Sequence, residues 1–198
     1  MAFEVTRSQS NCDPIRLAAR MERAASQLGA SIRPASRIVV LAVFGASVIA
    51  AFADEPALPN SIRTSGETVL LAVHAEGAQV YECKTDSTGR LAWFFREPIA
   101  TLIQNGKTVG RHYAGPQWEI ADGSSVVGKV ESKVDGVTPS DIPWLKLAVA
   151  SHNGQGVLAD ATTIQRINTH GGALSGECDA VGTLRSVPYS AEYVFSRQ

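Results

Sequence analysis

The chain has 198 residues, of which 18 are basic, 19 are acidic and 44% are hydrophobic. Charges of both signs are dispersed along it without a cluster of Lys and Arg, which is not the pattern of a nucleic-acid-binding surface. We therefore expect no nucleic-acid partner.

An apolar segment separates the N-terminal part from the rest of the chain. It runs from Ile38 to Ala53, follows an arginine-bearing stretch and ends in a small-x-small triplet at residues 51–53. Its 16 residues are fewer than the roughly 20 that a membrane-spanning helix needs, and the acidic residues Asp54 and Glu55 follow it. The pattern predicts a leader over residues 1–53 that ends in a helical, cleavable signal peptide, with an uncleaved anchor as the alternative.

Cleavage would leave residues 54–198 as a single exported domain, periplasmic or extracellular, with no stable membrane span. This part holds 12 basic and 16 acidic residues, a net charge of −4 without runs of one sign. An ordinary leader also results if synthesis starts at Met21, and residues 1–20 would then be an artefact of the assigned start.

Two of the three cysteines, Cys83 and Cys178, lie in residues 54–198, whereas Cys12 lies in the leader. A pair of cysteines in an oxidising compartment predicts a disulfide. Because the bridge would close a long loop over residues 84–177, the chain-entropy model gives it about 4 to 5 kcal/mol of stabilisation. Two free buried thiols are the alternative. No Cys or His stands at ligand spacing beside either cysteine, so we expect no metal.

Strand patterns dominate residues 54–198. β-branched and aromatic residues concentrate in nine or ten short segments bounded by turn residues, and no helix of ten residues is expected. The segments are 68–75, 79–84, 92–96, 100–103, 108–113, 117–120, 125–134, 144–150, 162–169 and 189–195.

Three short connections predict hairpins. Residues 76–78 separate the first two segments, and Asn105-Gly106 and Asp122-Gly123 are residue pairs that suit tight turns. Successive hairpins form an antiparallel meander. The sequence therefore predicts an all-β domain with one disulfide, either an antiparallel β-sandwich or a small β-barrel.

Several strings resemble one known family, domain of unknown function 3455, along nearly the whole of residues 54–198. They are HAEGAQVYECK (74–84), GRHYAGPQWEIADGSSVVGKV (110–130), DIPWLKLAVASHNGQGVL (141–158), IQRINTHGG (164–172), Cys178-Asp179 and VPYSAEYVF (187–195). The resemblance implies an exported bacterial or fungal protein with a recurrent cysteine pair and no established activity.

Known catalytic motifs find little support. Gly154, Gly156 and Ala159 match the glycine fingerprint of nucleotide-binding folds, but the residues after them favour a strand where the fingerprint needs a helix. There is no G-x-S-x-G elbow, and a bridged cysteine is not a nucleophile. We expect no cofactor.

Five residues are candidates for ligand binding. One hairpin could bring together His112, Tyr113 and Trp118, and strand alternation places Arg166 and Asn168 on one face of another segment. A guanidinium and an amide there could hold a carboxylate or a sugar hydroxyl. The leading hypothesis is a non-enzymatic exported domain that binds a small molecule, a glycan or an envelope component.

The alternative is a secreted hydrolase that uses His112 and Glu119 as an acid–base pair, which requires both side chains to share a cleft. Purely structural roles are a further alternative for His112 and Arg166. His112 could be a half-buried imidazole bonded to backbone, and Arg166 could pair with Glu82 or Glu192 on a neighbouring strand.

Overall fold

The computed structural model describes residues 58–198, which form strands, turns and loops. The predicted leader, the alternative start at Met21 and Cys12 fall within residues 1–57 and so lie outside the described part. No stretch of residues 58–198 forms an apolar helix long enough to cross a membrane.

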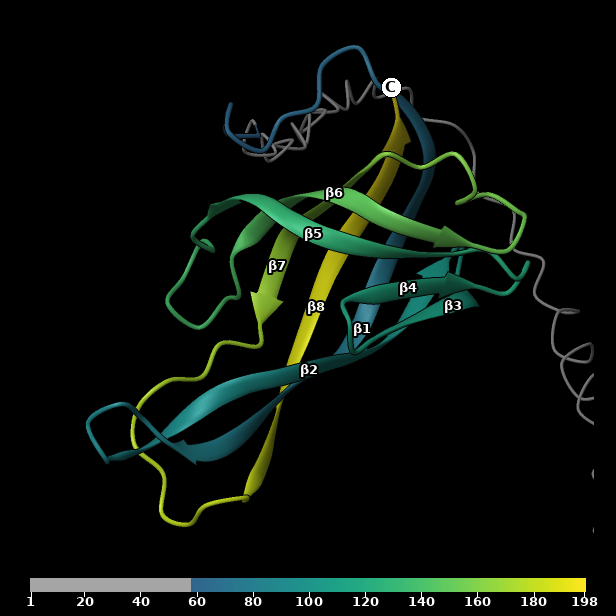
Figure 1. Ribbon diagram of the computed structural model, residues 1–198. Helices are drawn as coiled ribbons and strands as arrows, with labels where there is room; N and C mark the ends of the chain where they lie inside the picture. Colours follow the sequence, from purple (N-terminus) through teal and green to yellow (C-terminus); the bar gives the residue numbers. More distant parts are fainter. Residues whose placement is uncertain (1–57) are drawn as a thin grey trace, which may run out of the picture. The chain divides into compact units, whose positions relative to one another are not determined.

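Eight antiparallel strands form one closed barrel, in which each strand pairs with the next and β8 pairs with β1 (Figure 1). The all-β prediction is confirmed, and of the two architectures it left open the structure adopts the barrel. The strands are β1 (Thr68–Thr85), β2 (Leu91–Gln104), β3 (Lys107–Tyr113), β4 (Gln117–Ile120), β5 (Ser125–Val134), β6 (Trp144–Asn153), β7 (Thr163–Gly171) and β8 (Leu184–Arg197).

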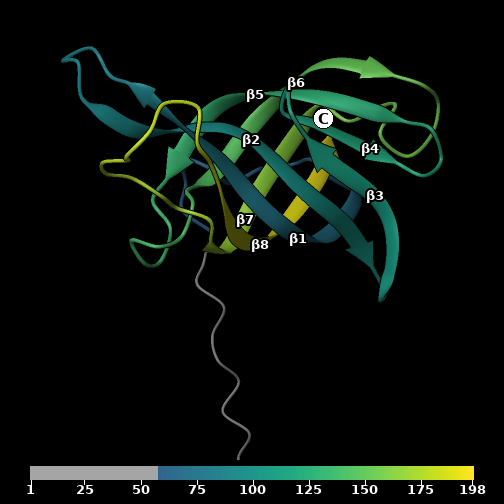
Figure 2. The same ribbon diagram turned by 90° about the horizontal axis from the view of Figure 1, so that it is seen from below.

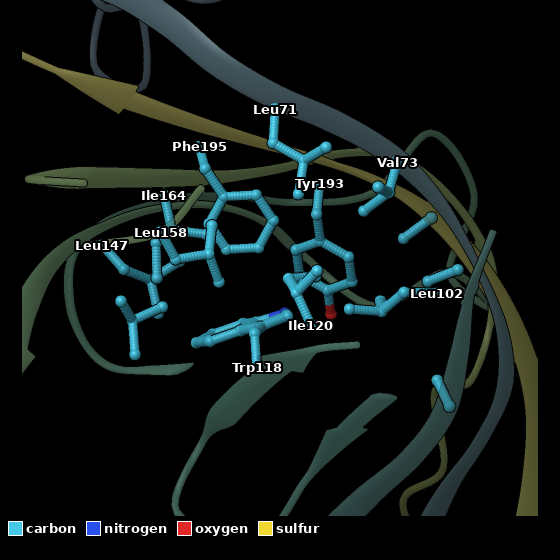
Figure 3. Close-up of a cluster of buried hydrophobic side chains, with 14 of the residues drawn as sticks. Leu71, Val73, Leu102, Trp118, Ile120, Leu147, Leu158, Ile164, Tyr193 and Phe195 are labelled. Atoms are coloured by element: carbon cyan, nitrogen blue, oxygen red, sulfur yellow. The ribbon is translucent and has the colours of Figure 1, made fainter. Parts of the chain in front are cut away.

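Strand alternation fills part of the barrel with apolar side chains. In β1, Leu71, Val73 and Ala75 are buried, whereas the intervening His74 and Glu76 reach solvent. These residues and their counterparts on the other strands form one buried cluster, of which Figure 3 draws the central members. Burying each large apolar side chain contributes about 1.5 to 3 kcal/mol, so this cluster is the main stabilising element of the fold.

The predicted hairpin at residues 76–78 is wrong, because β1 passes through these residues as a single strand. Gly77 is not in the left-handed region, and a Cβ at this position would collide with the backbone of Ile99 and Ala100 on β2. The glycine therefore serves close approach of two strands and not a turn.

β2 likewise joins two predicted segments into one strand that includes Pro98. Pro98 lies next to a register shift between Val80 and Tyr81 of β1, an irregularity at which a residue without an N–H is tolerated. These two mergers are why the structure has eight strands and not nine or ten.

The other predicted turns are confirmed. Asn105 and Gly106 both have positive φ, at 51° and 73°, and connect β2 to β3. Gly123 has a φ of 90° in the β4–β5 connection, where the Asp122 carboxylate accepts hydrogen bonds from the backbone and hydroxyl of Ser124. Asp122 also accepts one from the backbone N–H of Val157, so it fastens this turn to the loop that precedes β7.

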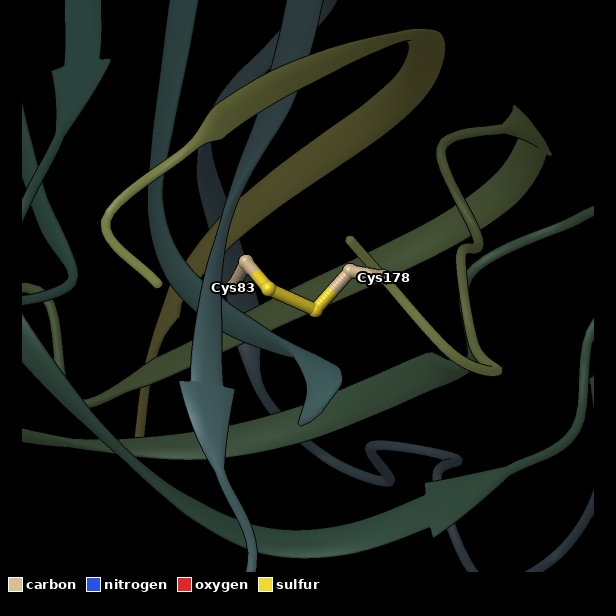
Figure 4. Close-up of a disulfide and its surroundings, with 2 residues drawn as sticks. All are labelled: Cys83 and Cys178. Atoms are coloured by element: carbon tan, nitrogen blue, oxygen red, sulfur yellow. A yellow bond between two sulfur atoms is a disulfide. The ribbon is translucent and has the colours of Figure 1, made fainter. Parts of the chain in front are cut away.

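The predicted disulfide between Cys83 and Cys178 is confirmed, with the two Cα atoms 5.9 Å apart (Figure 4). It joins β1 to the loop between β7 and β8, and that loop lies beside the projecting β1–β2 hairpin in both ribbon views (Figure 2). Backbone hydrogen bonds from Cys178 to Leu91 and from Trp93 to Gly176 hold the same two segments together. The bridge thus stabilises one end of the barrel.

Candidate ligand-binding pocket

A pocket of about 290 Å³ lies among the inward-facing side chains of the barrel, and all eight strands contribute to its lining. Eleven of its fourteen lining residues are apolar or aromatic, and the other three are Gln79, His112 and Arg166. Phe95 and Val130 also line it and are more than half and about half exposed, at 55% and 50%. The pocket therefore reaches the surface at these two residues.

His112 and Trp118 form one wall of the pocket. They face each other across β3 and β4, their rings stack with centroids 4.3 Å apart, and both side chains are buried. The ring nitrogen Nδ1 of His112 lies 2.9 Å from the carbonyl oxygen of Gln117. Because a carbonyl can only accept, Nδ1 carries the proton and donates it.

Burial lowers the pKa of His112 to about 4, against the opposing effect of its hydrogen bond to Gln117; the positive charge of Arg166 lowers it further. The imidazole is therefore neutral at pH 7, with a lone pair on Nε2. His112 thus has the backbone hydrogen bond that the structural interpretation expected, but it is almost fully buried and faces the pocket.

Arg166 extends from β7 toward the same space, two residues beyond the core residue Ile164. Its Nε and Nη2 atoms donate to the carbonyl oxygen of Pro143, at 3.1 and 2.8 Å. Within residues 58–198 it forms no ion pair with a carboxylate, and none of the pocket's lining residues is acidic. With His112 neutral, Arg166 is the pocket's only charged side chain.

The alternative ion pairs considered for Arg166 are not formed. Glu82 pairs with Lys84, at 3.1 Å, and Glu192 pairs with His74, at 2.7 Å. Arg166 is instead opposite Tyr193 in the register of β7 and β8. Its charge is thus available to the pocket.

Two further polar groups in the pocket form no hydrogen bond of ordinary geometry among the described residues, although they lie close enough to the Tyr189 and Tyr193 hydroxyls to oppose the rise in the pKa of those phenols. They are the side-chain amide nitrogen of Gln79 and the indole nitrogen of Trp118, on side chains that are only 2% and 1% exposed. A buried polar group without a hydrogen bond costs about 1 to 3 kcal/mol, so such groups are rare in native proteins. Figure 3 shows the Tyr193 hydroxyl directed toward the Trp118 ring, in the same region.

The structure brings together three of the five predicted ligand-binding residues, namely His112, Trp118 and Arg166. Tyr113 is not among them, because it follows His112 on β3 and its hydroxyl donates to the Glu119 carboxylate, 2.8 Å away. Asn168 is not among them either. It has a positive φ of 50° at a register shift of β7, which ends the alternation that would have aligned it with Arg166.

Asn168 instead lines a second, separate hollow together with Trp144, His170, His74 and Glu192. The third tryptophan, Trp93, lines neither the pocket nor this hollow. Of the three tryptophans of the chain, Trp118 alone contributes to the interior pocket.

His112 and Glu119 do not share a cleft. Glu119 is opposite Arg111 in the register of β3 and β4, whereas His112 is opposite Trp118, so alternation places the two side chains on opposite faces. Arg111 lies 2.9 Å from the Glu119 carboxylate. The hydrogen bond from Tyr113, followed by that from Arg111, lowers the pKa of Glu119. Glu119 is thus an ionised surface carboxylate and lacks the contact with His112 that an acid–base pair requires.

No group of three or more His, Cys, Asp or Glu side chains in residues 58–198 is placed to hold a metal ion. Among the lining residues that were not predicted from the sequence are Gln79 and Tyr193. Gln79 could have been found if β1 had been read as one strand, because the buried positions Leu71, Val73 and Ala75 continue by alternation to residue 79. A glutamine on an otherwise apolar face is an informative signal.

Comparison with known proteins identifies one family. A family model described as "Protein of unknown function (DUF3455)" matches residues 64–197. The matched segment includes all eight strands and every residue that lines the pocket. No curated protein and no solved structure matches the chain.

Proposed function

The chain belongs to the DUF3455 family, and we propose that it is a binding protein that holds a small molecule inside the barrel. The composition of the interior pocket carries this proposal: an apolar and aromatic lining surrounds a few polar groups, one of them an arginine without an acidic partner. This is the usual composition of a small-molecule site. A volume of about 290 Å³ is at the small end of such sites and favours a ligand of one or two rings.

The closed barrel supports binding because it holds the lining residues in place before a ligand arrives. Each lining strand is hydrogen-bonded on both sides, and the stacked His112–Trp118 pair is fixed by the bond from His112 to Gln117. A site that is already ordered loses little conformational entropy when it binds. Hydrolysis is disfavoured, because His112 and Glu119 lie on opposite faces of the sheet.

We propose in addition that the protein acts after export, in the periplasm or outside the cell, with residues 1–53 removed. The Cys83–Cys178 bridge is consistent with this proposal, because disulfides persist in oxidising compartments. Intact-mass spectrometry tests it. We expect a mature chain that begins at Asp54 and gains two hydrogens on reduction, and a full-length mass would contradict export with cleavage.

Isothermal titration calorimetry with two probes, 2-naphthoate and 2-naphthamide, tests the binding function. Each has two fused rings, and we expect at least one of them to bind with one-to-one stoichiometry. The variant Val130→Trp places a large side chain where the pocket reaches the surface and should weaken binding at least about tenfold, because it blocks entry. Val69→Trp is the control, since Val69 is similarly exposed, at 58%, but does not line the pocket.

We expect Val69→Trp to leave the affinity within about twofold of wild type, because Val69 does not line the pocket. If neither probe binds the wild-type protein, or if the two variants weaken binding equally, the interior pocket is not a binding site.

A further inference from the structure

We propose that the pocket is selective for aromatic carboxylic acids, with the carboxylate bound by Arg166 and the ring packed against the aromatic wall. This inference rests on the binding function proposed above and specifies the chemical class of the ligand. Three independent features of the pocket lead to it: its charge, its unpartnered donors and its aromatic lining.

The positive charge of the pocket favours an anionic ligand. Arg166 is its only charged lining residue, and the neighbouring glutamates pair elsewhere. Its hydrogen bonds to Pro143 use Nε and one proton of Nη2, and a further contact with the Tyr193 hydroxyl opposes the rise in the pKa of that phenol, so at least two of the five guanidinium N–H donors remain. The edge formed by Nη1 and Nη2 is the geometry that binds a carboxylate through two parallel hydrogen bonds.

The positive charge of Arg166 also affects the pKa values of the neighbouring side chains. It lowers the pKa of His112, after the larger effect of burial, and it opposes the rise in pKa that burial produces at Tyr193. Burial is the larger cause at both residues, so the imidazole is neutral and the phenol stays protonated despite the charge of Arg166. A ligand that carries a negative charge therefore meets no competing charge in this pocket, whereas an amine would be repelled.

The unpartnered donors point to the same class. The amide nitrogen of Gln79 and the indole nitrogen of Trp118 are buried in the pocket and, within residues 58–198, approach the Tyr189 and Tyr193 hydroxyls without forming a hydrogen bond of ordinary geometry. Together with Arg166 they offer N–H groups from three strands, β1, β4 and β7. A carboxylate has about four acceptor sites and no donor, so its oxygens match these three N–H groups; the neutral Nε2 of His112 is an acceptor and is not a partner for them.

The lining favours a ring over a small inorganic anion. Tyr193 packs edge-on against both His112 and Trp118, with centroids 5.2 and 5.3 Å away, and Tyr81 packs edge-on against Phe95 at 5.9 Å. These rings form two apolar surfaces on which a planar ligand can stack or pack edge-on. An acetate-sized anion would leave most of this surface without contacts.

Calorimetry with 2-naphthoate, the matched neutral 2-naphthamide and acetate tests the proposal. In the wild-type protein we expect 2-naphthoate to bind about 10- to 100-fold more tightly than 2-naphthamide, the range typical of a hydrogen bond to a charged group. Acetate should bind more weakly than 2-naphthoate by at least a similar factor, because it lacks the rings.

The variant Arg166→Gln should remove the preference for the acid and leave the affinity for 2-naphthamide within about threefold. Arg111→Gln is the matched control, because Arg111 is an exposed arginine on the outer face of β3 and should keep the full preference. A thermal melt verifies that Arg166→Gln is folded. If it is not, Arg166→Lys replaces it and should weaken 2-naphthoate at least fivefold and 2-naphthamide less than twofold, because lysine lacks the planar pair of donors.

Each remaining outcome overturns the proposal. Equal wild-type affinity for 2-naphthoate and 2-naphthamide shows a site without acid selectivity and leaves the binding function intact. Acetate binding as tightly as 2-naphthoate shows a site for small anions only. Retention of the full preference in the folded Arg166→Gln variant, or an unchanged pattern in Arg166→Lys, shows that Arg166 does not bind the acid. If neither naphthalene compound binds, the binding function fails as well.

Discussion

His112 is buried and neutral, and this gives the protein a pH-dependent stability with a definite sign. Its pKa is about 4 in the folded chain, below the value of about 6.5 expected for an unfolded one. The unfolded state therefore binds more protons between these two values. Stability from this group is fully present above about pH 6.5 and is lost progressively as the pH falls toward 4.

Comparison of the wild type with His112→Gln measures this effect. We expect the free energy of unfolding of the wild type to decrease relative to that of the variant by about 2 kcal/mol between pH 7 and pH 5, since one pKa unit corresponds to about 1.4 kcal/mol. Urea denaturation at the two pH values gives the difference. His74 has a raised pKa because its ring nitrogens donate hydrogen bonds to the Glu76 and Glu192 carboxylates, and it acts with the opposite sign, but it is present in both proteins and cancels. A difference that does not change with pH would contradict a buried, neutral His112.

For single residues, the sequence indicated which side chains have binding chemistry but not whether those side chains face the same space. Arg166 and Trp118 could be selected because a guanidinium and an indole are typical binding groups. Whether they share a space depends on register. The shift in β7 between Ile167 and His170 separates Asn168 from Arg166, and no local pattern in the sequence marks this shift.

Close approach between β1 and β2 determines how the first two strands form. Gly77 has an extended backbone, and a side chain there would collide with Ile99 and Ala100. We expect Gly77→Ala to destabilise the protein by about 3 kcal/mol or more, since the backbone of two paired strands must shift to accommodate a methyl group.

Gly89→Ala is the control for this prediction. Gly89 has a φ of 86° in the β1–β2 turn, but no atom lies near its Cβ position, so the substitution should cost only about 1 to 2 kcal/mol of backbone strain. Urea denaturation of both variants measures the two costs. Equal losses of stability would mean that Gly77 is needed for backbone conformation and not for close approach.

The strand ends show why elements were easier to predict than their connections. The segments 117–120 and 125–134 coincide with β4 and β5, because turn residues bound them and their apolar residues are β-branched or aromatic. Gly77 and Pro98, in contrast, are residue types typical of loops, yet they lie within long strands. Their roles depend on a contact between β1 and β2, which residue preferences along one segment do not describe.

In the whole domain, the disulfide and the closed barrel stabilise different parts of the structure. Cys83 and Cys178 fasten the β7–β8 loop to β1, and the Tyr81 hydroxyl joins the same loop to the pocket by donating to the Gly172 carbonyl, 2.7 Å away. The barrel itself is closed by β1 and β8 without help from the bridge.

The double variant Cys83→Ala/Cys178→Ala tests this division. We expect it to fold, with a free energy of unfolding lower by up to about 4 to 5 kcal/mol, the entropic value for a loop of this length. Chemical denaturation followed by far-ultraviolet circular dichroism measures the loss. A variant that is unfolded in buffer would show that the barrel depends on the bridge.

A crystal structure with 2-naphthoate tests most directly the claim that the barrel holds a small ligand. We predict that the naphthalene rings lie inside the barrel between Trp118 and the opposite wall, with the carboxylate within hydrogen-bond distance of the Arg166 guanidinium. Binding of 2-naphthoate only on the outer surface, with the interior pocket unchanged, would contradict this account.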